Sequence, residues 1–509
     1  MRNSYRYCSG LIWGLIFSAV VASASWPALA GTPLELKDSI QIAVRQSPAV
    51  LLARQKLQLA LARLQRGQAA LFPLLDVGAS KSYGGRLQNT SFPQSWEQTD
   101  EYALSLKIHQ SLSPLLSGLG VDPGLSGQAG VSGALSRLDL RAAEAQFQKD
   151  LETLVIDVIS KYIEVLKAEN NLTLSQKSVE KAQTYLFQAQ AKFEQGTILK
   201  VDLLKMQTQL ATTRYNLLRA ENALKDAQAG FNRLLGYPAD QPLKLAANLP
   251  SGLFAGDTGD TGDAGVQASV GLQKEIASAL DKRSEIVLEK IAVQQARIKA
   301  SQARTQTWPT FTLTGSYGNS DDLNGSISLE TKDWNLTTDI SKGASLSGTG
   351  SARASQDPQD WAVTLGLKWN LFDGGSARSS MREADLTVSQ AETNLHQTED
   401  TVAQDVRRSH HALLEAHSRL PALEAARTEA EENLKVVSAQ YRAGEKTAAD
   451  LFDAELALLA AQNDYKDAQL DQLVAEAVFQ RATGNLDISR NFGVELPRVE
   501  LPKDVGDGS

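Results

Sequence analysis

The chain has 509 residues, of which 42% are hydrophobic and 22% are charged, and both values are ordinary for a folded protein. Its formal net charge is -8. No run rich in lysine and arginine of the kind that contacts phosphates is present, so composition and charge exclude a nucleic-acid partner.

The first thirty residues predict a secretory signal peptide. Arg2 and Arg6 give a positive start, an apolar run follows over 11–21, and Ala28-Leu29-Ala30 is typical of a cleavage site. The single cysteine, Cys8, lies inside this segment. We therefore expect an exported mature chain with no disulfide and no cysteine-based metal site.

The rest of the chain repeats itself. A shift of 248 residues places Phe193-x-x-Gly196 on Tyr441-x-x-Gly444, and a shift of 236 places Phe72-Pro73 on Trp308-Pro309. Each half then has the order short helix, two strands, long helix, turn and medium helix, which indicates an internal duplication. The predicted parts are a signal peptide (1–30), a first repeat (31–250), a flexible linker (251–270), a second repeat (271–486) and a periplasmic C-terminal tail (487–509).

Apolar residues recur every seven positions along both predicted long helices, which is typical of coiled coils. The first series is Leu151, Val158, Val165, Leu172, Val179, Leu186 and Phe193, and the second is Val406, Leu413, Leu420, Leu434 and Tyr441. At a rise of roughly 1.5 Å per residue, a helix over 138–195 would be about 85 Å long, too long to be covered by one compact domain.

Four runs alternate apolar and polar residues, as strands with one lipid-facing and one water-facing side do. They cover 74–83, 102–109, 311–317 and 361–371, and the alternation is weakest in the first. No later segment has the apolar length of a membrane helix. The polar, Gly- and Ser-rich segments Gly84–Gln98 and Asn319–Asp360 are predicted to be surface loops.

Four strands cannot close a barrel, and an open edge in lipid leaves unpaired backbone groups that cost several kcal/mol each. Two copies would give about eight strands and a filled interior, whereas three give twelve and a lumen. The predicted fold is mainly α with a β part: long coiled-coil helices joined to four transmembrane strands per chain, which complete a 12-stranded β-barrel when three copies assemble.

Leu371-Phe372-Asp373-Gly374-Gly375 follows the last strand, and the two paired turns begin Phe193-x-x-Gly196 and Tyr441-x-x-Gly444. With the duplicated order, these features resemble the outer-membrane efflux protein (TolC) family. The resemblance implies a homotrimer whose 12-stranded β-barrel sits in the outer membrane and is continued by a long coiled-coil α-barrel into the periplasm. There its tip docks a periplasmic adaptor protein and an inner-membrane pump. It implies a passive exit duct for efflux or type I secretion, with no cofactor and no catalytic residues, and it does not name the cargo.

The resemblance also implies roles at the tip. Two acids that follow the second turn, Asp450 and Asp453, would line the constriction, and three copies would gather six carboxylates there. Such a ring favours cations and raises the pKa of its own members. The alternative is that two acids near a helix start complement the helix dipole.

A gate latch is expected at the same end of the molecule, with Asp202 facing Tyr441 and with Lys446 as a basic member. The family's polar partner for that lysine falls on Val201, whose side chain accepts no hydrogen bond. The residues expected to contact the adaptor are Gly196, Thr197, Ile198, Leu199, Lys200, Gly444, Thr447 and Ala448.

Two other classes of protein are weighed against a channel. A periplasmic coiled-coil scaffold would share the helices but not need the strands. An exported metal-dependent enzyme could use His410 and His417, two turns apart on a helix, yet no acidic partner completes a ligand set. No GxSxG, P-loop or HExxH pattern is present, so we predict that the chain is not an enzyme.

Two segments fit none of these roles. Leu112-Ser113-Pro114, followed by a Gly-rich insertion to Gly133, replaces the Phe-Asp-Gly-Gly found after the last strand. The Gly-Asp-Thr repeats of 255–268 lack the glutamate of a calcium loop, so we interpret them as a flexible loop.

Overall fold

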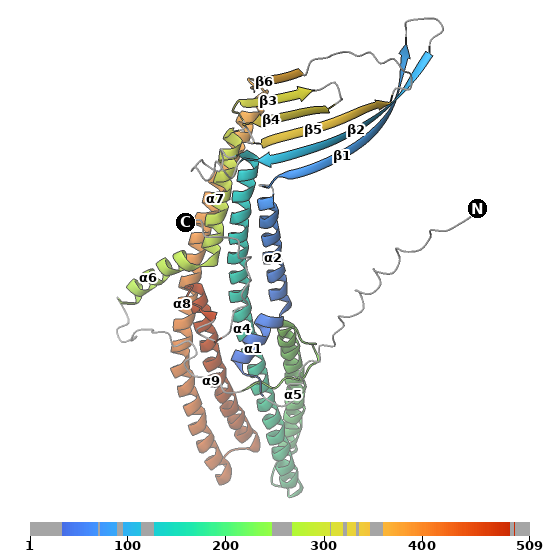
Figure 1. Ribbon diagram of the computed structural model, residues 1–509. Coiled ribbons are helices and arrows are strands. Elements are labelled where there is room, and N and C mark those ends of the chain that lie inside the picture. Colours follow the sequence, from blue (N-terminus) through green and yellow to red (C-terminus); the bar gives the residue numbers. More distant parts are fainter. Residues whose placement is uncertain are drawn as a thin grey trace, which may run out of the picture.

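The computed structural model describes residues 33–69, 72–88, 95–112, 127–246, 267–305, 307–318, 323–331, 335–346, 360–488 and 493. The molecule is long, with one β-sheet at its upper end and a bundle of long helices below it (Figure 1). The predicted signal peptide (1–30) and most of the predicted linker and tail lie outside the described residues.

The helices of the two halves match in order and length. The first half contains α1 (Leu36–Gln46), α2 (Pro48–Ala69), α4 (Gly127–Glu194) and α5 (Lys200–Leu235). The second half contains α6 (Gln267–Lys282), α7 (Ser284–Thr305), α8 (Ser376–Ala443) and α9 (Ala448–Ala482). Both long helices, α4 and α8, have 68 residues, and both α2 and α7 have 22, as the repeated order predicts. Among the described helices, none is both long and apolar enough to cross a membrane.

Four helices lie abreast at each level of the bundle. Near the sheet the neighbours are α2, α4, α7 and α8 in that order, and near the lower end they are α5, α4, α9 and α8. The long helices α4 and α8 therefore run the whole height. The shorter helices α2 and α7 lie beside them in the upper part, and α5 and α9 lie beside them in the lower part (Figure 1). In this row of described helices, α2 and α5 lie at one end and α8 lies at the other, where it also contacts α6.

The seven-residue pattern of α4 packs as the sequence predicts over most of its length. Val158 and Val165 are fully buried in the main apolar core, whereas Phe193 at the lower end is 39% exposed. The equivalent series on α8 is less covered, since Val406 is buried but Leu413 and Leu434 are only half-buried. Within one chain, the apolar series of α4 is therefore more fully buried by neighbouring helices than the equivalent series of α8.

The sheet has six strands, all antiparallel to their neighbours. They are β1 (Leu74–Gln88), β2 (Ser95–Ser111), β3 (Thr310–Gly318), β4 (Leu323–Glu330), β5 (Asn335–Leu346) and β6 (Asp360–Lys368), in the spatial order β1-β2-β5-β4-β3-β6. Within the described residues, β1 and β6 each pair on one side only, so the sheet has two open edges.

The sheet has six strands where the sequence predicts four, and the described parts of the two predicted surface loops lie mostly in strands. Much of Gly84–Gln98 lengthens β1 and β2, while Asn319–Asp360 contains the additional hairpin β4–β5. The physical reason is that alternate residues of a strand point to opposite faces, so a segment that is polar overall still forms a strand when its few apolar residues share one face. The alternation of Ile327 and Leu329 with serines was the signal for a strand, and the overall polarity of the segment hid it.

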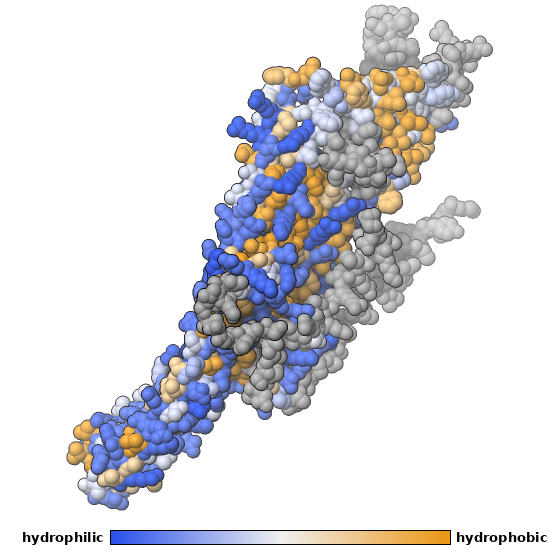
Figure 2. All heavy atoms as spheres, turned by 90° about the vertical axis from the view of Figure 1, so that its left-hand side faces the viewer, coloured by the Kyte–Doolittle hydropathy of each residue, from blue (hydrophilic) through white to orange (hydrophobic). Residues whose placement is uncertain are grey.

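The strand register gives the sheet one apolar and one polar face. Val77, Leu106 and Ile340 are partners across three adjacent strands, and they lie on the same face because directly paired residues do so. On the opposite face, Lys107 Nζ lies 3.3 Å from the Asp339 carboxylate. The apolar face is open to the surroundings, and Figure 2 shows hydrophobic side chains gathered over this upper end.

Candidate functional site

The lower end of the molecule is formed by two helix turns, one between α4 and α5 and one between α8 and α9 (Figure 1). Gly196 and Gly444 adopt φ angles of 73° and 81°, which a residue with a side chain rarely adopts. The backbone N–H of Gly196 donates to the Phe193 carbonyl, and Gly444 donates to Tyr441 in the same way. The two turns that the sequence aligned therefore have the same local structure.

Asp450 belongs to a capping box at the start of α9. Its carboxylate accepts hydrogen bonds from the Thr447 backbone N–H at 2.9 Å and from the Thr447 hydroxyl at 2.8 Å. The Asp450 backbone N–H in turn donates to the Thr447 side chain. These bonds satisfy backbone donors at the helix start. A negative charge at this position also complements the helix dipole, which is what the alternative interpretation expects.

The two acids predicted to form a ring are in different surroundings. The hydrogen bonds from Thr447, helped by the charge of Lys446, hold the pKa of Asp450 below its ordinary value. Asp453 lies three residues further along α9 and is exposed. The rise in pKa that a carboxylate ring would cause requires the carboxylates of other copies of the chain. The acidic ring therefore stays a prediction.

Tyr441 makes its contacts with α4. The Lys192 ammonium donates a 2.8 Å hydrogen bond to the Tyr441 hydroxyl and lies 4.5 Å from the centre of its ring. Within the described chain, the Asp202 side chain has no hydrogen bond or ion pair with Tyr441, and Lys446 has none with α5. The latch between Asp202 and Tyr441 remains a prediction about neighbouring coils, while Lys192 is a partner that the sequence analysis missed.

An apolar cluster stands directly above the two turns. Phe452 is fully buried there, with its ring edge-on to Tyr185 at a centroid distance of 5.9 Å. Burial, followed by the nearby Glu455 carboxylate, raises the pKa of Tyr185. Lys181 lies 3.3 Å from that carboxylate, so the start of α9 is fixed against α4 by both apolar and charged contacts.

The turn residues themselves are on the surface. Leu199 is 71% exposed and Val201 is 59% exposed, while Ile198 packs partly against the cluster above. Thr197 donates a hydrogen bond back to the Lys192 carbonyl, which closes the first turn. Figure 2 shows hydrophobic side chains at this lower end, separated from the sheet by a more hydrophilic stretch of helix.

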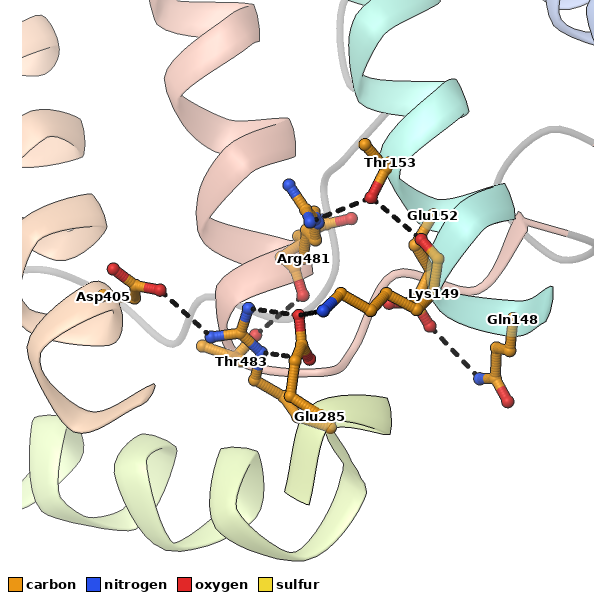
Figure 3. Close-up of polar contacts among 10 residues, drawn as sticks. Gln148, Lys149, Glu152, Thr153, Glu285, Asp405, Arg481 and Thr483 are labelled. Carbon is orange, nitrogen blue, oxygen red and sulfur yellow. Dashed lines mark hydrogen bonds and ion pairs between the residues drawn. The ribbon is translucent and has the colours of Figure 1, made fainter. Parts of the chain in front are cut away.

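A second group of polar side chains lies at mid-height and joins the two halves. Arg283, just before α7, contacts both Glu285 carboxylate oxygens at 3.3 Å and lies 3.6 Å from Asp405 of α8. On the facing side, Arg481 of α9 donates to the Thr153 hydroxyl of α4 at 3.0 Å (Figure 3). Lys149 of α4 lies 3.8 Å from the Glu285 carboxylate, so four helices meet through polar and charged groups at this level. We call these contacts the mid-height junction.

Glu152 lies beside this junction and bonds to Gln148 (Figure 3). Burial, the largest cause, raises the pKa of Glu152, and the Glu285 charge adds to the effect. The side chain of Arg283 is only 9% exposed, so its charge depends on the acidic partners around it. No spacing pattern predicts this group, because its members come from four separate segments of the chain.

The histidines of α8 do not gather ligands. His410 packs against Phe479 of α9 with the ring centroids 5.8 Å apart, and burial lowers its pKa. The His417 ring is within 3.3 Å of the Gln472 amide. In the described part of the chain, no three His, Cys, Asp or Glu side chains are close enough to hold a metal ion.

Comparison with known proteins agrees with this architecture. The family model described as "Outer membrane efflux protein" matches residues 121–237 and 276–485. The chain is 23% identical over 452 residues to the outer membrane protein TolC of Salmonella enteritidis, covering 87% of this chain and 81% of that protein. It is also 23% identical over 459 residues to the alkaline protease secretion protein AprF of Pseudomonas aeruginosa, covering 89% and 85%.

Among solved structures, the Campylobacter jejuni CmeC outer membrane channel superposes with a TM-score of 0.66 at 14% identity, covering 90% of this chain and 88% of that one. At this identity the likeness shows the fold. Since the family model matches well over half of the chain, the protein belongs to the outer membrane efflux protein family. It is an efflux channel protein of the outer membrane, with a helical part that extends into the periplasm.

Proposed function

We propose that the protein is a homotrimeric exit duct of a tripartite efflux or type I secretion system, with a gated periplasmic tip. The observation that carries the proposal is an open, two-faced sheet standing on a row of four long helices in each chain. The apolar face would contact outer-membrane lipid, and the polar face would line a water-filled channel. Energy for transport would come from a pump in the inner membrane, which is a partner that the family resemblance implies.

The open edges and flanks support a ring of identical chains. An unpaired strand edge in lipid costs several kcal/mol for each backbone group, so β1 and β6 need partners. Exposed apolar side chains lie on the helices at both ends of the row: Leu52 on α2, Tyr215 and Leu218 on α5, and Leu414 and Val436 on α8. Contacts between unlike surfaces of successive copies close into a ring, and the family resemblance implies three copies.

The tip supports a gate and a docking surface. The exposed Leu199 and Val201 offer an apolar contact to a periplasmic adaptor protein, which is the partner that the resemblance implies. Asp450 and Asp453 of three chains would form the acidic constriction, and Asp202, Tyr441 and Lys446 would latch neighbouring coils. The equal lengths of α4 and α8 and the matching turns support an origin of the two halves by internal duplication.

A periplasmic scaffold is the weaker proposal. Trp361 is 76% exposed and Leu365 is 75% exposed on the apolar sheet face, and a protein surrounded by water rarely exposes so large an apolar patch. A scaffold would be released from cell envelopes by a salt wash, whereas a channel requires detergent.

The experiment is to extract the full chain with detergent and record currents in planar bilayers. We expect discrete single-channel steps from the detergent-extracted protein and none from a mock preparation. Release by salt alone, together with bilayers that stay silent, would refute the channel and favour the scaffold.

A further inference from the structure

The additional hairpin β4–β5 lies between the strands of the two halves. Helix α2 leads into β1, β2 leads towards α4, α7 leads into β3, and β6 leads into α8. The strands that adjoin the helices therefore have the order β1-β2-β3-β6, which is the order α2-α4-α7-α8 of the helices below. The hairpin separates β2 from β3, directly above the place where α4 contacts α7 (Figure 1).

The hairpin is fully paired on both sides. The β2–β5 register runs from Asp100–Leu346 to Ser111–Asn335, and the β3–β4 register runs from Thr312–Glu330 to Gly318–Asn324. Side chains support the first of these pairings, because Lys107 forms an ion pair with Asp339. His109 also lies within hydrogen-bond distance of Thr337, at 3.2 Å.

The hairpin also continues the two faces of the sheet without a break. Ile327 and Ile340 are exposed on the face that carries Val77 and Leu365. Across β2, β5, β4 and β3, the row Lys107, Asp339, Ser326 and Ser316 is polar throughout. A surface loop folded over the mouth of a channel would have no need for an apolar face in register with membrane strands.

The widths of the two layers agree when the hairpin is counted. Four helices spaced about 9 Å apart cover about 36 Å of a ring. Six strands spaced roughly 4.8 Å apart and tilted by roughly 40° cover about 37 Å, whereas four such strands would cover about 25 Å. Four strands would need a steeper tilt to match the same row of helices.

From these observations we propose that β4–β5 is part of the membrane wall, so that each chain contributes six strands and a closed wall of three chains has eighteen. The count of three rests on the proposed function, while the count of six per chain rests on the sheet alone. A wall of eighteen strands is wider than one of twelve, because barrel diameter grows with strand number. The connection between β2 and α4 (112–126) is also longer than that between β6 and α8 (369–375), which gives β2 the reach to stand apart from β3.

Disulfide trapping tests the six-strand sheet within one chain. The mature chain contains no cysteine if residues 1–30 are removed, so introduced pairs report without background. Ser105 and Ser341 are partners in the register, and their Cα atoms lie within disulfide reach in any antiparallel pair. We expect S105C/S341C to form an intramolecular disulfide in the membrane-embedded protein, seen as a mobility shift that reductant abolishes.

The matched control is K107C/S316C, on the same polar face. Two strands lie between these positions, so the Cα atoms are roughly 14 Å apart and no disulfide should form. A wall that excluded the hairpin would bring β2 beside β3. A disulfide in K107C/S316C but not in S105C/S341C would therefore overturn the proposal.

A density map of the detergent-solubilised full chain gives the strand count. Eighteen strands around a threefold axis would support both the wall and the trimer. Six strands per chain in a particle of another symmetry would uphold the hairpin in the wall and refute the trimer of the proposed function. Twelve strands in a threefold particle would uphold the trimer and refute the place of the hairpin.

Discussion

Two acids near the tip, Asp450 and Asp453, have different surroundings. Asp450 is occupied by the capping box, and its lowered pKa means that it stays ionised over the physiological range. Asp453 is exposed and free of the cap, which makes it the better probe of a carboxylate ring. A change at Asp450 alters the helix start and the charge together, whereas a change at Asp453 alters only the charge.

We expect D453N to weaken block of the channel by multivalent cations added on the periplasmic side, because three carboxylates leave the constriction. Conductance and half-blocking concentration in planar bilayers measure this effect. T447A is the control, since it removes the cap at a cost of about 1 kcal/mol but keeps every carboxylate. Equal block in D453N and the parent would contradict the acidic ring.

The partner of Tyr441 can be found by comparing two single substitutions. Lys192 bonds Tyr441 within the chain, so we expect K192M to loosen the tip and raise single-channel conductance. A hydrogen bond to a charged group contributes about 1.5–3 kcal/mol, enough to shift an open–closed ratio roughly tenfold or more. D202N tests the latch between neighbouring coils. If D202N raises the single-channel conductance and K192M leaves it unchanged, the aspartate of the neighbouring coil restrains Tyr441 and Lys192 does not.

Glu152 should make stability depend on pH. Burial raises its pKa, so the folded chain holds a proton that the unfolded chain releases once pH exceeds the ordinary value. By linkage, the free energy of unfolding falls as pH rises from the ordinary glutamate pKa through the folded one. E152Q removes this loss and keeps the shape of the side chain. We expect it to unfold at a higher temperature than the parent at pH 8 and at a similar temperature near pH 4. An identical difference at both pH values would contradict the assignment.

At the scale of helices, the mid-height junction fixes α7 against α8 and α9 against α4. The Arg283 side chain is nearly buried and bridges α7 to α8, while Arg297 pairs with Glu392 at 2.8 Å on the surface of the same two helices. Removing one partner of a buried pair leaves a charge without compensation, whereas an exposed pair contributes little.

R283M should therefore destabilise the chain by about 3 kcal/mol. The matched control R297M should cost less than about 1 kcal/mol, because both partners of that pair are solvated. Thermal unfolding followed by helical circular dichroism in detergent compares the two. Equal midpoints for R283M and R297M would mean that the junction does not fix the helices.

The helices could be predicted from the sequence because their signals are local. Seven-residue spacing identifies α4 and α8, and the glycines at 196 and 444 mark their ends. The hairpin β4–β5 could not be predicted so easily, because its apolar residues are few and its polar face resembles a loop. Its place in the sheet depends on pairing with β2, more than two hundred residues away, which no local pattern records.

The candidate site was predicted in part. The turn residues lie where the spacing placed them, and within the chain Tyr441 bonds Lys192 of α4, a contact that the sequence analysis did not predict. The latch between Asp202 and Tyr441 stays a prediction about neighbouring coils. Lysines carry no periodic signal that distinguishes a tip contact from a solvated surface. The mid-height junction was missed for the same reason, since Arg283, Asp405 and Arg481 meet only after the helices pack.

At the scale of the whole molecule, a single chain leaves strand edges and apolar surfaces without partners among its described residues. Its sheet has two open edges, and its outer helices expose apolar side chains on both flanks. An apolar sheet face at one end and a small apolar tip at the other define two different surroundings for one long particle (Figure 2). The proposed ring of copies would pair the strand edges and cover the flanks together, and it would leave a continuous passage between the ends.

Imaging of single particles of the detergent-extracted full chain tests this account most directly. We expect threefold rotational symmetry, a β-wall inside the detergent belt and a helical tube that projects from it on one side. Particles that contain one chain, or that carry their detergent on any part other than the sheet, would contradict the account.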